Sequence, residues 1–396
     1  MRTAADDLDA WIPRLLAAWR AARREPARRG PRPPPDELLP DELREVAGGV
    51  ARLSTGLTRD RELAGARYLD DARLLGAYLL FYWPISDLQA RGVLSELPRP
   101  PTVALDLGSG PGPLAFAALD AGAAQVTAGD RAKGALATAR ELARLAGRAG
   151  AALTTREWNP TSGLPLAGLL GGTRPDVILL GHVLNELWKG EGAAARRAAL
   201  LEEARGLLAP GGSLVVIEPA LRDTSRALLA VRDLLVAGGA AVRAPCLFRG
   251  ACPALTRESD WCHAERAIVP PRLVAQIGKA AGLRKEAVKM SYLVLAPPGE
   301  GWAAPPPGRV FRIVSEPLAG KGRLRYMGCG PEGRLGLALQ ARHVDDGNRH
   351  FEGLLRGDVV ALEGAEPRGD GLALGAGSRV TVLAPAGRPV PGGPVV

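Results

Sequence analysis

Cysteine, lysine and aromatic residues are scarce in this 396-residue chain. It has four cysteines, only six of its 51 basic residues are lysine, and aromatic residues make up 4%. So few cysteines in so long a chain exclude the dense disulfide framework of a small secreted domain. The most apolar run, LLGAYLLFYWPI, is too short to cross a bilayer and is interrupted by Pro84. We therefore expect a cytoplasmic protein without a membrane partner, whose thiols stay reduced.

An excess of acidic residues is also missing. Basic residues outnumber acidic ones by 51 to 42, which gives a net charge of +9. Arginine presents a planar fork of donors that suits phosphate, so the balance favours an acidic partner such as nucleic acid. More than half of this charge falls in residues 241–289, whose net charge is +5. An arginine-rich overall composition explains the bias of the whole chain without such a partner, and a solvated face explains the basic segment.

Hydrophobic periodicity divides the chain into three parts. Residues 1–100 have apolar residues at helical spacing, which predicts a helical N-terminal region. Residues 101–300 alternate short apolar strands with helices, which predicts a Rossmann-like α/β domain with a parallel sheet and an inserted cysteine segment at 241–266. After a Pro-rich linker, residues 306–396 contain short strand-like runs between glycine-rich turns. They predict a small β-barrel or sandwich, and an oligonucleotide-binding (OB) type barrel is one candidate.

A glycine-rich turn, LDLGSGPGP (105–113), follows the first predicted strand of the α/β region. Its glycines let the backbone approach a ligand closely, and Asp106 ends the strand just before them. A second acid, Asp130, ends the next strand, where a carboxylate can accept hydrogen bonds from both ribose hydroxyls of an adenosyl group. A structural glycine turn or a nucleotide-dependent oxidoreductase would use the same physics.

The strand–turn–helix context resembles the S-adenosylmethionine-dependent methyltransferases, whose first motif reads much like LDLGSGPG. The resemblance implies a class I methyltransferase domain, with Asp106 and the glycines facing the methionine part of S-adenosyl-L-methionine (SAM) and Asp130 facing the ribose. Asn159 follows the third strand, beside the adenine, and His182 follows the fourth. The expected cofactor-binding residues are Asp106, Gly108, Ser109, Gly110, Gly112, Asp130, Asn159 and His182.

Residues that would carry out methyl transfer are not evident. Amino- and base-methylating enzymes of this fold often hold the target nitrogen with NPPY or DPPY after the fourth strand, but here the chain reads GHVLNEL (181–187). No cysteine lies there that could attack a pyrimidine ring. His182, Asn185 and Glu186 offer polar contacts, although a helix N-cap at Asn185 explains the same residues. The catalytic residues therefore stay unknown at this stage.

Three of the four cysteines fall within CLFRGACPALTRESDWCH (246–263), and the spacing is C-x5-C-x9-C-x66-C. Zinc ribbons and fingers usually take their ligands in close C-x2–4-C pairs, and no such pair exists here. Irregular spacing suits a larger cage such as an iron–sulfur cluster. Zinc stays the alternative, and four unrelated buried thiols are the remaining one. The candidate metal ligands are Cys246, Cys252, Cys262 and Cys329.

Several segments, in a fixed order, resemble the mitochondrial methyltransferase-like assembly factors of the small ribosomal subunit and their bacterial relatives. They span roughly Tyr68 to Asp358 and read LDLGSGPG, HVLNEL, VVIEPA, APCLFRGACP, DWCHAER, SYLVL, GKGRLRYMGC and GLLRGD. The chain departs from that family by a longer second gap and by CLFRGAC in place of CPHDxxC. The resemblance implies a four-iron, four-sulfur ([4Fe-4S]) cluster on the four cysteines and a role on the small subunit through its rRNA.

These observations predict a SAM-binding methyltransferase-like protein that binds small-subunit rRNA during assembly, as a monomer. Two functional classes stay open: an enzyme that methylates the rRNA, and an assembly factor that binds SAM and the cluster structurally. A small-molecule methyltransferase with a zinc site is a third possibility.

Overall fold

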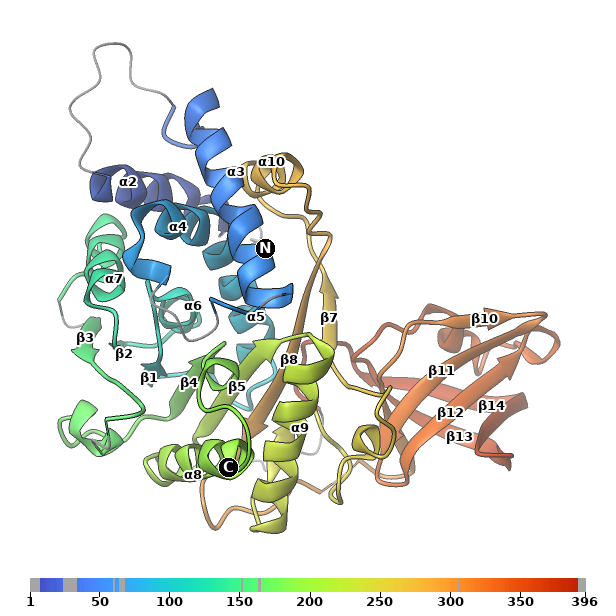
Figure 1. Ribbon diagram of the computed structural model, residues 1–396. Coiled ribbons are helices and arrows are strands. Elements are labelled where there is room, and N and C mark those ends of the chain that lie inside the picture. Colours follow the sequence, from blue (N-terminus) through green and yellow to red (C-terminus); the bar gives the residue numbers. More distant parts are fainter. Residues whose placement is uncertain are drawn as a thin grey trace. The chain divides into compact units, whose positions relative to one another are not determined.

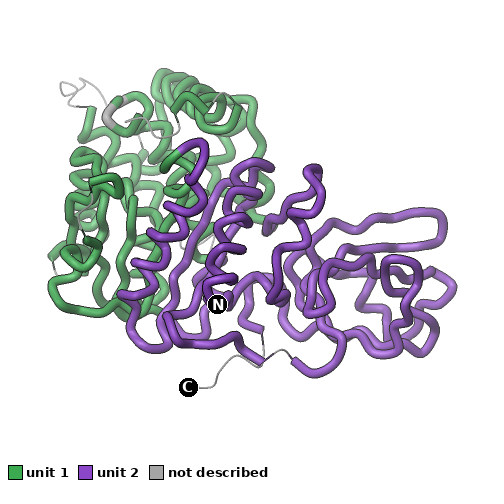
Figure 2. Tube along the Cα trace, turned by 60° about the horizontal axis from the view of Figure 1, so that its bottom comes forward, with its two compact units in different colours: residues 1–91, 101–188, 267–288 green, residues 92–100, 189–266, 289–396 purple. Residues whose placement is uncertain are grey.

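The computed structural model describes residues 8–23, 34–59, 61–63, 68–150, 152–162, 165–304 and 306–390. Residues 1–7 and 24–33 of the predicted helical region and residues 391–396 of the predicted β-domain lie outside this part of the chain. The chain divides into two compact units (Figure 2). The first unit comprises Met1–Arg91, Pro101–Trp188 and Ala267–Val288, and the second comprises Gly92–Pro100, Lys189–Arg266 and Lys289–Val396.

The first unit is built on four parallel strands in the order β3-β2-β1-β4 (Figure 1). They are β1 (Val103–Leu107), β2 (Gln125–Asp130), β3 (Leu153–Glu157) and β4 (Val177–Gly181). β1 and β4 read VALDL and VILLG, near-continuous apolar runs that suit strands covered on both faces. Their crossover helices include α6 (Pro113–Asp120) and α7 (Lys133–Leu145). The carboxyl ends of β1, β2 and β4 therefore meet at one edge, where open α/β sheets bind ligands.

Further helices of this unit come from the N-terminal region. They are α2 (Ile12–Ala22), α3 (Pro40–Ser54), α4 (Ala72–Ala77) and most of α5 (Trp83–Leu94), together with α10 (Arg272–Ala280), which packs beside α3. Trp11, just before α2, packs against Trp83 and Phe116 with ring centroids 5.1 and 4.7 Å apart. Its indole nitrogen also donates a hydrogen bond to Asp120 at 3.1 Å. These contacts fix α2 against α5 and α6, because a fully buried tryptophan tolerates little change in its neighbours.

The second unit contains an α/β part in which β8 is the central strand. β8 runs antiparallel to both β5 and β6 and also pairs with β7. The elements of this part are α8 (Ala193–Gly206), β5 (Ser213–Pro219), α9 (Arg222–Ala237), β6 (Val242–Ala244), β7 (Ala264–Ala267) and β8 (Ala287–Leu295). The cysteine segment lies between β6 and β7, with a 3-10 turn at Pro253–Leu255.

The rest of the second unit is a closed β-barrel. Its strands are β9 (Arg309–Ile313), β10 (Leu318–Gly320), β11 (Arg323–Gly330), β12 (Gly333–Gln340), β13 (Val359–Arg368) and β14 (Gly371–Ala384). Their order is β10-β11-β12-β14-β13-β9, and β9 also pairs with β11, which closes the barrel. β12 and β14 run parallel, and the other pairs are antiparallel. With β10 set aside, this is a five-stranded Greek-key barrel of the OB type.

The predicted fold class is confirmed: a Rossmann-like α/β fold with N-terminal helices and a small C-terminal β-barrel. Phe311, Tyr326 and Phe351 fill the barrel interior, and the last two rings meet edge to face at 5.1 Å. Among the described residues no helix is long and apolar enough to cross a membrane.

Candidate functional site

The glycine turn lies at the carboxyl end of β1, in the first unit. The backbone N–H groups of Gly108 and Ser109 both donate to the carbonyl of Gly129 in β2, at 2.8 and 3.0 Å. Gly108, Gly110 and Gly112 all have positive φ, a conformation that side chains with a Cβ rarely adopt. Gly110 is buried, and a Cβ there would come into van der Waals contact with Leu69 at 3.5 Å, so the missing side chain lets other groups approach this backbone closely.

Asp106 lies directly beneath this turn and is 1% exposed. One carboxylate oxygen accepts a hydrogen bond from the N–H of Ala115 at 3.0 Å, in the first turn of α6. The other oxygen is buried and has no hydrogen-bond partner among the described residues. Burial, together with the nearby charge of Asp130, raises the pKa of Asp106 to about 8, although the hydrogen bond from Ala115 opposes the increase. The free oxygen is a ready acceptor for a cationic or N–H group of a ligand.

Asp130 ends β2 and faces the same turn. Its carboxylate accepts hydrogen bonds from the N–H groups of Gly110 and Ala132, each at 2.7 Å. Burial raises the pKa of this carboxyl, and the two backbone hydrogen bonds oppose the increase. Asp106, Asp130 and the glycines are thus brought together at one edge of the sheet, as the motif predicts.

His182 follows β4 in a left-handed conformation, with φ of 61°. Its Nε2 lies 2.9 Å from Oε1 of Gln89. Burial, together with the positive charge of Lys285, lowers the pKa of His182 to about 4. The imidazole is therefore neutral at pH 7, and with Nε2–H donating to Gln89 its Nδ1 is an acceptor.

Asn159 and Asn185 are engaged in local structure. The Asn159 side chain is exposed and accepts hydrogen bonds from the backbone N–H and the hydroxyl of Thr161, at 3.1 and 2.9 Å. Asn185 donates to the carbonyl of His182 at 2.8 Å and accepts from Arg61 at 2.9 Å. Asn185 lies in a short 3-10 turn at Leu184–Glu186, not at a helix N-cap. Trp158, by contrast, is buried against Gly129, next to Asp130.

Tyr78 is a site residue that the sequence does not reveal. Its hydroxyl lies 4.0 Å from the position that a Cβ on Gly110 would occupy. Burial raises the pKa of Tyr78, and the nearby carboxylates of Asp106 and Asp130 raise it further. In the sequence this tyrosine belongs to an aromatic stripe that reads as core packing. The one available signal is that its hydroxyl needs a polar neighbour when buried.

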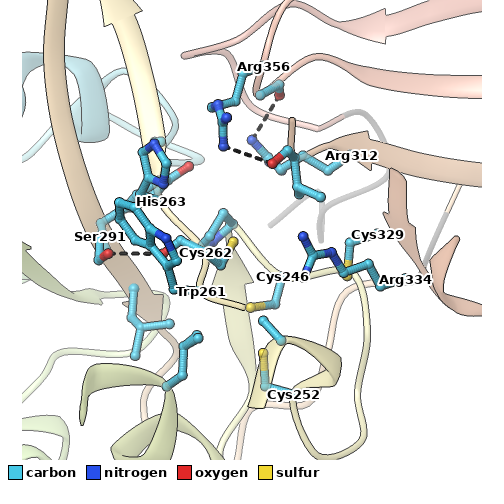
Figure 3. Close-up of a pocket in the computed structure, with 18 of the residues that line it drawn as sticks. Cys246, Cys252, Trp261, Cys262, His263, Ser291, Arg312, Cys329, Arg334 and Arg356 are labelled. Carbon is cyan, nitrogen blue, oxygen red and sulfur yellow. Dashed lines mark hydrogen bonds between the residues drawn. The ribbon is translucent and has the colours of Figure 1, made fainter. Parts of the chain in front are cut away.

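The four cysteines line one pocket in the second unit (Figure 3). Cys246 follows β6, Cys252 and Cys262 lie in the loop before β7, and Cys329 lies on β11 of the barrel. None is paired in a disulfide. Cys329 thus meets three cysteines that lie more than sixty residues earlier in the sequence. Four unrelated thiols would not be expected to gather in one pocket.

Hydrogen bonds fix the cysteine loop from several elements. The N–H of Cys252 donates to the carboxylate of Asp233 at 2.9 and 3.0 Å, and the carbonyl of Cys262 accepts from the hydroxyl of Ser291 at 3.0 Å. Arg226 donates to the carbonyls of Ala254, Arg257 and Asp260, at 3.1, 2.8 and 2.6 Å. These bonds hold the backbone of the loop that carries Cys252 and Cys262 in one conformation.

Arginines surround these thiols. Cys329 on β11 pairs directly with Arg334 on β12 and with Arg312 on β9, so all three side chains share one face of the barrel. Arg266 and Arg356 line the same pocket. The sequence shows a positive charge near the cysteine segment, but the cross-strand neighbours of Cys329 become visible only with the strand register.

Burial raises the pKa of all four thiols. It raises the pKa of Cys252 to about 12 and that of Cys262 to about 11, and it also raises those of Cys246 and Cys329. The charge of neighbouring thiolates adds to the effect at Cys252, Cys262 and Cys329. Four thiolates therefore repel one another here unless positive charge lies among them. Within the described residues, no three His, Cys, Asp or Glu side chains are placed to hold a single metal ion.

The basic segment at 241–289 is only partly available to a partner. Arg243 pairs with Glu300, and its side chain is 13% exposed. Arg266 binds Glu96 at 3.0 Å and is also largely buried. Lys289 pairs with Glu265 at 3.0 Å. The +5 charge of the segment therefore overstates the phosphate-binding surface.

A family model for the mitochondrial small ribosomal subunit Rsm22 matches residues 97–352, more than half of the chain. The chain belongs to this family. The match includes the glycine turn and all four cysteines, as the sequence motifs predict. No curated protein matches the chain.

Solved methyltransferases are similar to parts of the chain. An O-methyltransferase family protein from Burkholderia thailandensis is 18% identical, with 65% of this chain and 73% of that one covered and a TM-score of 0.38. A methyltransferase from Pyrococcus furiosus is 17% identical over 53% and 81%, with a TM-score of 0.35. A ribosomal protein L11 methylase from Lactobacillus delbrueckii subsp. bulgaricus is 15% identical over 54% and 77%, with a TM-score of 0.32.

Proposed function

We propose that this protein binds SAM and acts on the small ribosomal subunit, holding its rRNA during assembly. The family match over residues 97–352, to a model named for the mitochondrial small ribosomal subunit, carries this proposal. The glycine turn at the carboxyl end of β1 supports the cofactor, and the OB-type barrel supports the RNA.

The first-unit site fits a methyl donor with a cationic amino acid end and a ribose. The free oxygen of Asp106 would accept a hydrogen bond from the donor's ammonium group, and Gly110 has no side chain to block the approach of the ligand to the backbone. Asp130 would exchange its bond to Gly110 for the ribose hydroxyls. Tyr78 and Trp158 would enclose the ligand and exclude water. The donor itself supplies an activated methyl group.

Isothermal titration calorimetry with SAM tests this site. Asp130→Asn should weaken binding at least tenfold, because a neutral amide accepts hydroxyl hydrogen bonds less well than a carboxylate. Glu157→Gln is the matched control, since Glu157 ends the neighbouring strand β3 and its side chain is 64% exposed. Equal affinity in both variants and the wild type would contradict the assignment.

The RNA surface proposed here is a row of cations on the barrel. Lys321, Arg323 and Arg325 are exposed on and just before β11, and within the described residues no ion pair joins them to an acid. Across the strand register, Arg323 lies opposite Gln340 and Arg325 opposite Ala338, so neither arginine has an acidic cross-strand neighbour in β12. OB folds bind oligonucleotides on the face of their second and third strands, which here are β11 and β12.

Salt dependence of RNA binding tests this surface. Replacing Arg323 and Arg325 with glutamine removes two phosphate contacts and should lower the slope of log K against log salt by about 1.4, since each contact to a single strand contributes about 0.7. Arg342→Gln with Arg349→Gln is a charge-matched control on exposed residues between β12 and β13. The proposed surface is wrong if both double variants change the slope equally.

Two roles are consistent with such a protein: a methyltransferase acting on rRNA and an assembly factor without catalysis. His182 and Asn185 occupy the place of the missing NPPY motif. The side chain of His182 contacts Gln89 and that of Asn185 accepts a hydrogen bond from Arg61, so neither is free to hold a target base. This favours the assembly factor without catalysis. Tritiated methyl donor incubated with precursor small subunits separates the two. Label in the rRNA shows the enzyme, and its absence with intact subunit binding shows the factor.

The cysteine pocket supports a [4Fe-4S] cluster on Cys246, Cys252, Cys262 and Cys329. Four thiols from separate parts of the chain line it, and four thiolates are the usual ligand set of such a cluster. Buried Nε–H groups of Arg266, Arg312 and Arg334 line the same pocket without partners among the described residues, as expected around an anionic group. The bound cluster would supply positive iron among the four thiolates and join the barrel to the cysteine loop.

We also propose a domain division, an oligomeric state and a location for this protein. The division into a helical region at 1–100, a methyltransferase domain at 101–300 and a β-domain at 306–396 is one of them. The others are a monomeric state and a cytoplasmic location, where a reducing medium keeps the thiols available as ligands.

A further inference from the structure

Arginines in and around the cysteine pocket have hydrogen-bond donors that no partner among the described residues uses. Arg232 lies close enough to Cys246 for its charge to lower the pKa of that thiol, against the larger effect of burial. Arg232 is 1% exposed, and its two terminal nitrogens donate to the carbonyls of Phe248 and Gly250 in the cysteine loop. Its Nε is buried and has no partner among the described residues. An unpaired buried donor costs about 1–3 kcal/mol. Such a donor is expected where a ligand supplies the acceptor.

Arg334 has the same feature on the barrel side of the pocket. One terminal nitrogen donates to Asp260 at 2.9 Å, which fixes the side chain, while the Nε stays buried without a partner. Arg334 is the direct cross-strand neighbour of Cys329, and Figure 3 shows it among Cys246, Cys262 and Cys329. Its charge also lowers the pKa values of Cys262 and Cys329, against the dominant effect of burial.

Arg356 lines the same pocket but is committed elsewhere. Its Nε donates to Glu316 at 3.1 Å and a terminal nitrogen donates to the carbonyl of Val314 at 2.8 Å. Arg334 and Arg356 therefore differ in whether Nε–H is available, although both place one positive charge at the pocket.

We propose that Arg334 and Arg232 donate Nε–H···S hydrogen bonds to the sulfur atoms of the cluster and its cysteine ligands. The inference rests on the cluster proposed above. Both residues are positioning residues: they stabilise the negative charge on the thiolate-ligated cluster and so raise its reduction potential. N–H groups close to thiolate and sulfide favour the reduced form, which carries one more negative charge.

Two measurements on anaerobically purified protein test the inference. In dithionite-reduced protein labelled with ¹⁵N at arginine Nε, pulsed electron paramagnetic resonance should detect ¹⁵N coupled to the cluster spin. The coupling should weaken in Arg334→Gln and persist in Arg356→Gln. The reduction equilibrium should shift about tenfold further toward the oxidised form in Arg334→Gln than in Arg356→Gln, which is about 59 mV for one electron.

The outcomes separate this inference from the cluster itself. If the wild type contains no iron and sulfide, the cluster proposal fails and the inference fails with it. If the cluster is present but shows no ¹⁵N coupling, or if Arg334→Gln and Arg356→Gln shift the potential equally, only the inference fails. If Arg334→Gln loses the cluster on purification, the ¹⁵N coupling in the wild type decides, and Arg334→Lys reports the potential with the charge retained.

Discussion

Removing the Glu96 carboxylate should strongly destabilise the second unit. Glu96 is buried, and both its oxygens accept hydrogen bonds from the hydroxyl of Tyr292 at 2.8 Å. Arg266 binds it at 3.0 Å and Arg312 at 3.4 Å. The single carboxylate thus joins β7, β8 and β9, which come from the α/β part and the barrel.

The expected cost follows from what Glu96→Ala leaves behind. Two arginine side chains, exposed by 15% and 6%, lose their counter-ion and cannot be fully solvated. Breaking a buried pair by removing one partner costs about 3–5 kcal/mol. Glu96→Gln keeps an acceptor for Tyr292 and should cost less. Arg266 and Arg312 also border the cysteine pocket, so cluster content should fall with stability.

Urea unfolding followed by circular dichroism measures this effect as a shift in the midpoint. Glu316→Gln is the control: it removes an ion pair with Arg356 in which the glutamate side chain is 62% exposed, so its effect should stay below about 1 kcal/mol. If the free energy of unfolding of Glu96→Ala lies within 1 kcal/mol of the wild-type value, the Glu96 carboxylate does not stabilise the second unit as proposed. That result would mean that the arginines reach water once the carboxylate is gone.

Three other predictions concern the glycine turn, the cysteine pocket and the barrel. Because the pKa of Asp106 is raised to about 8, most of this carboxyl is protonated at pH 7, so SAM binding should release a proton and tighten as pH rises toward 8; calorimetry in buffers of different ionisation enthalpy checks this, and proton release that persists in Asp106→Asn would contradict it. Cys329→Ser should lower iron content and speed proteolysis in the 296–308 segment, since the cluster would join the barrel to the cysteine loop; unchanged iron excludes Cys329 as a ligand. Gly330→Ala should destabilise the barrel by about 1–3 kcal/mol, because its Cβ would collide with the carbonyl of Val310; Gly336→Ala, where nothing lies within 4 Å, is the control.

Local motifs predicted the framework well because they report on local physics. LDLGSGPGP combines a buried strand, positive-φ glycines and a helix start, and these three signals together define the turn after β1. The alternation of strands and helices likewise identified the sheet. The spacing of the cysteines, with no close pair, predicts a wide metal site, which stays a prediction; the structure shows that all four cysteines line one pocket.

The sequence could not predict contacts that depend on register. Arg334 and Arg312 flank Cys329 only because β11 lies between β12 and β9 in a closed barrel. Tyr78 reads as core packing until α4 and the following π-helical turn bring it to Gly110. Asn159, predicted beside the adenine from its place after β3, accepts two hydrogen bonds from Thr161 in its own turn, which the sequence did not reveal. The net charge of residues 241–289 likewise does not show how many of its cations are available to a partner, because Arg243 and Arg266 are largely buried and paired with acids.

Crosslinking in living cells tests whether this protein binds the rRNA of the small ribosomal subunit. After ultraviolet irradiation, the protein is purified under denaturing conditions and the attached RNA is sequenced. We expect the reads to concentrate on small-subunit rRNA. They should fall sharply when Arg323 and Arg325 are replaced by glutamine, but not when Arg342 and Arg349 are. Reads spread over unrelated RNAs, or concentrated on large-subunit rRNA, would contradict a role on the small ribosomal subunit.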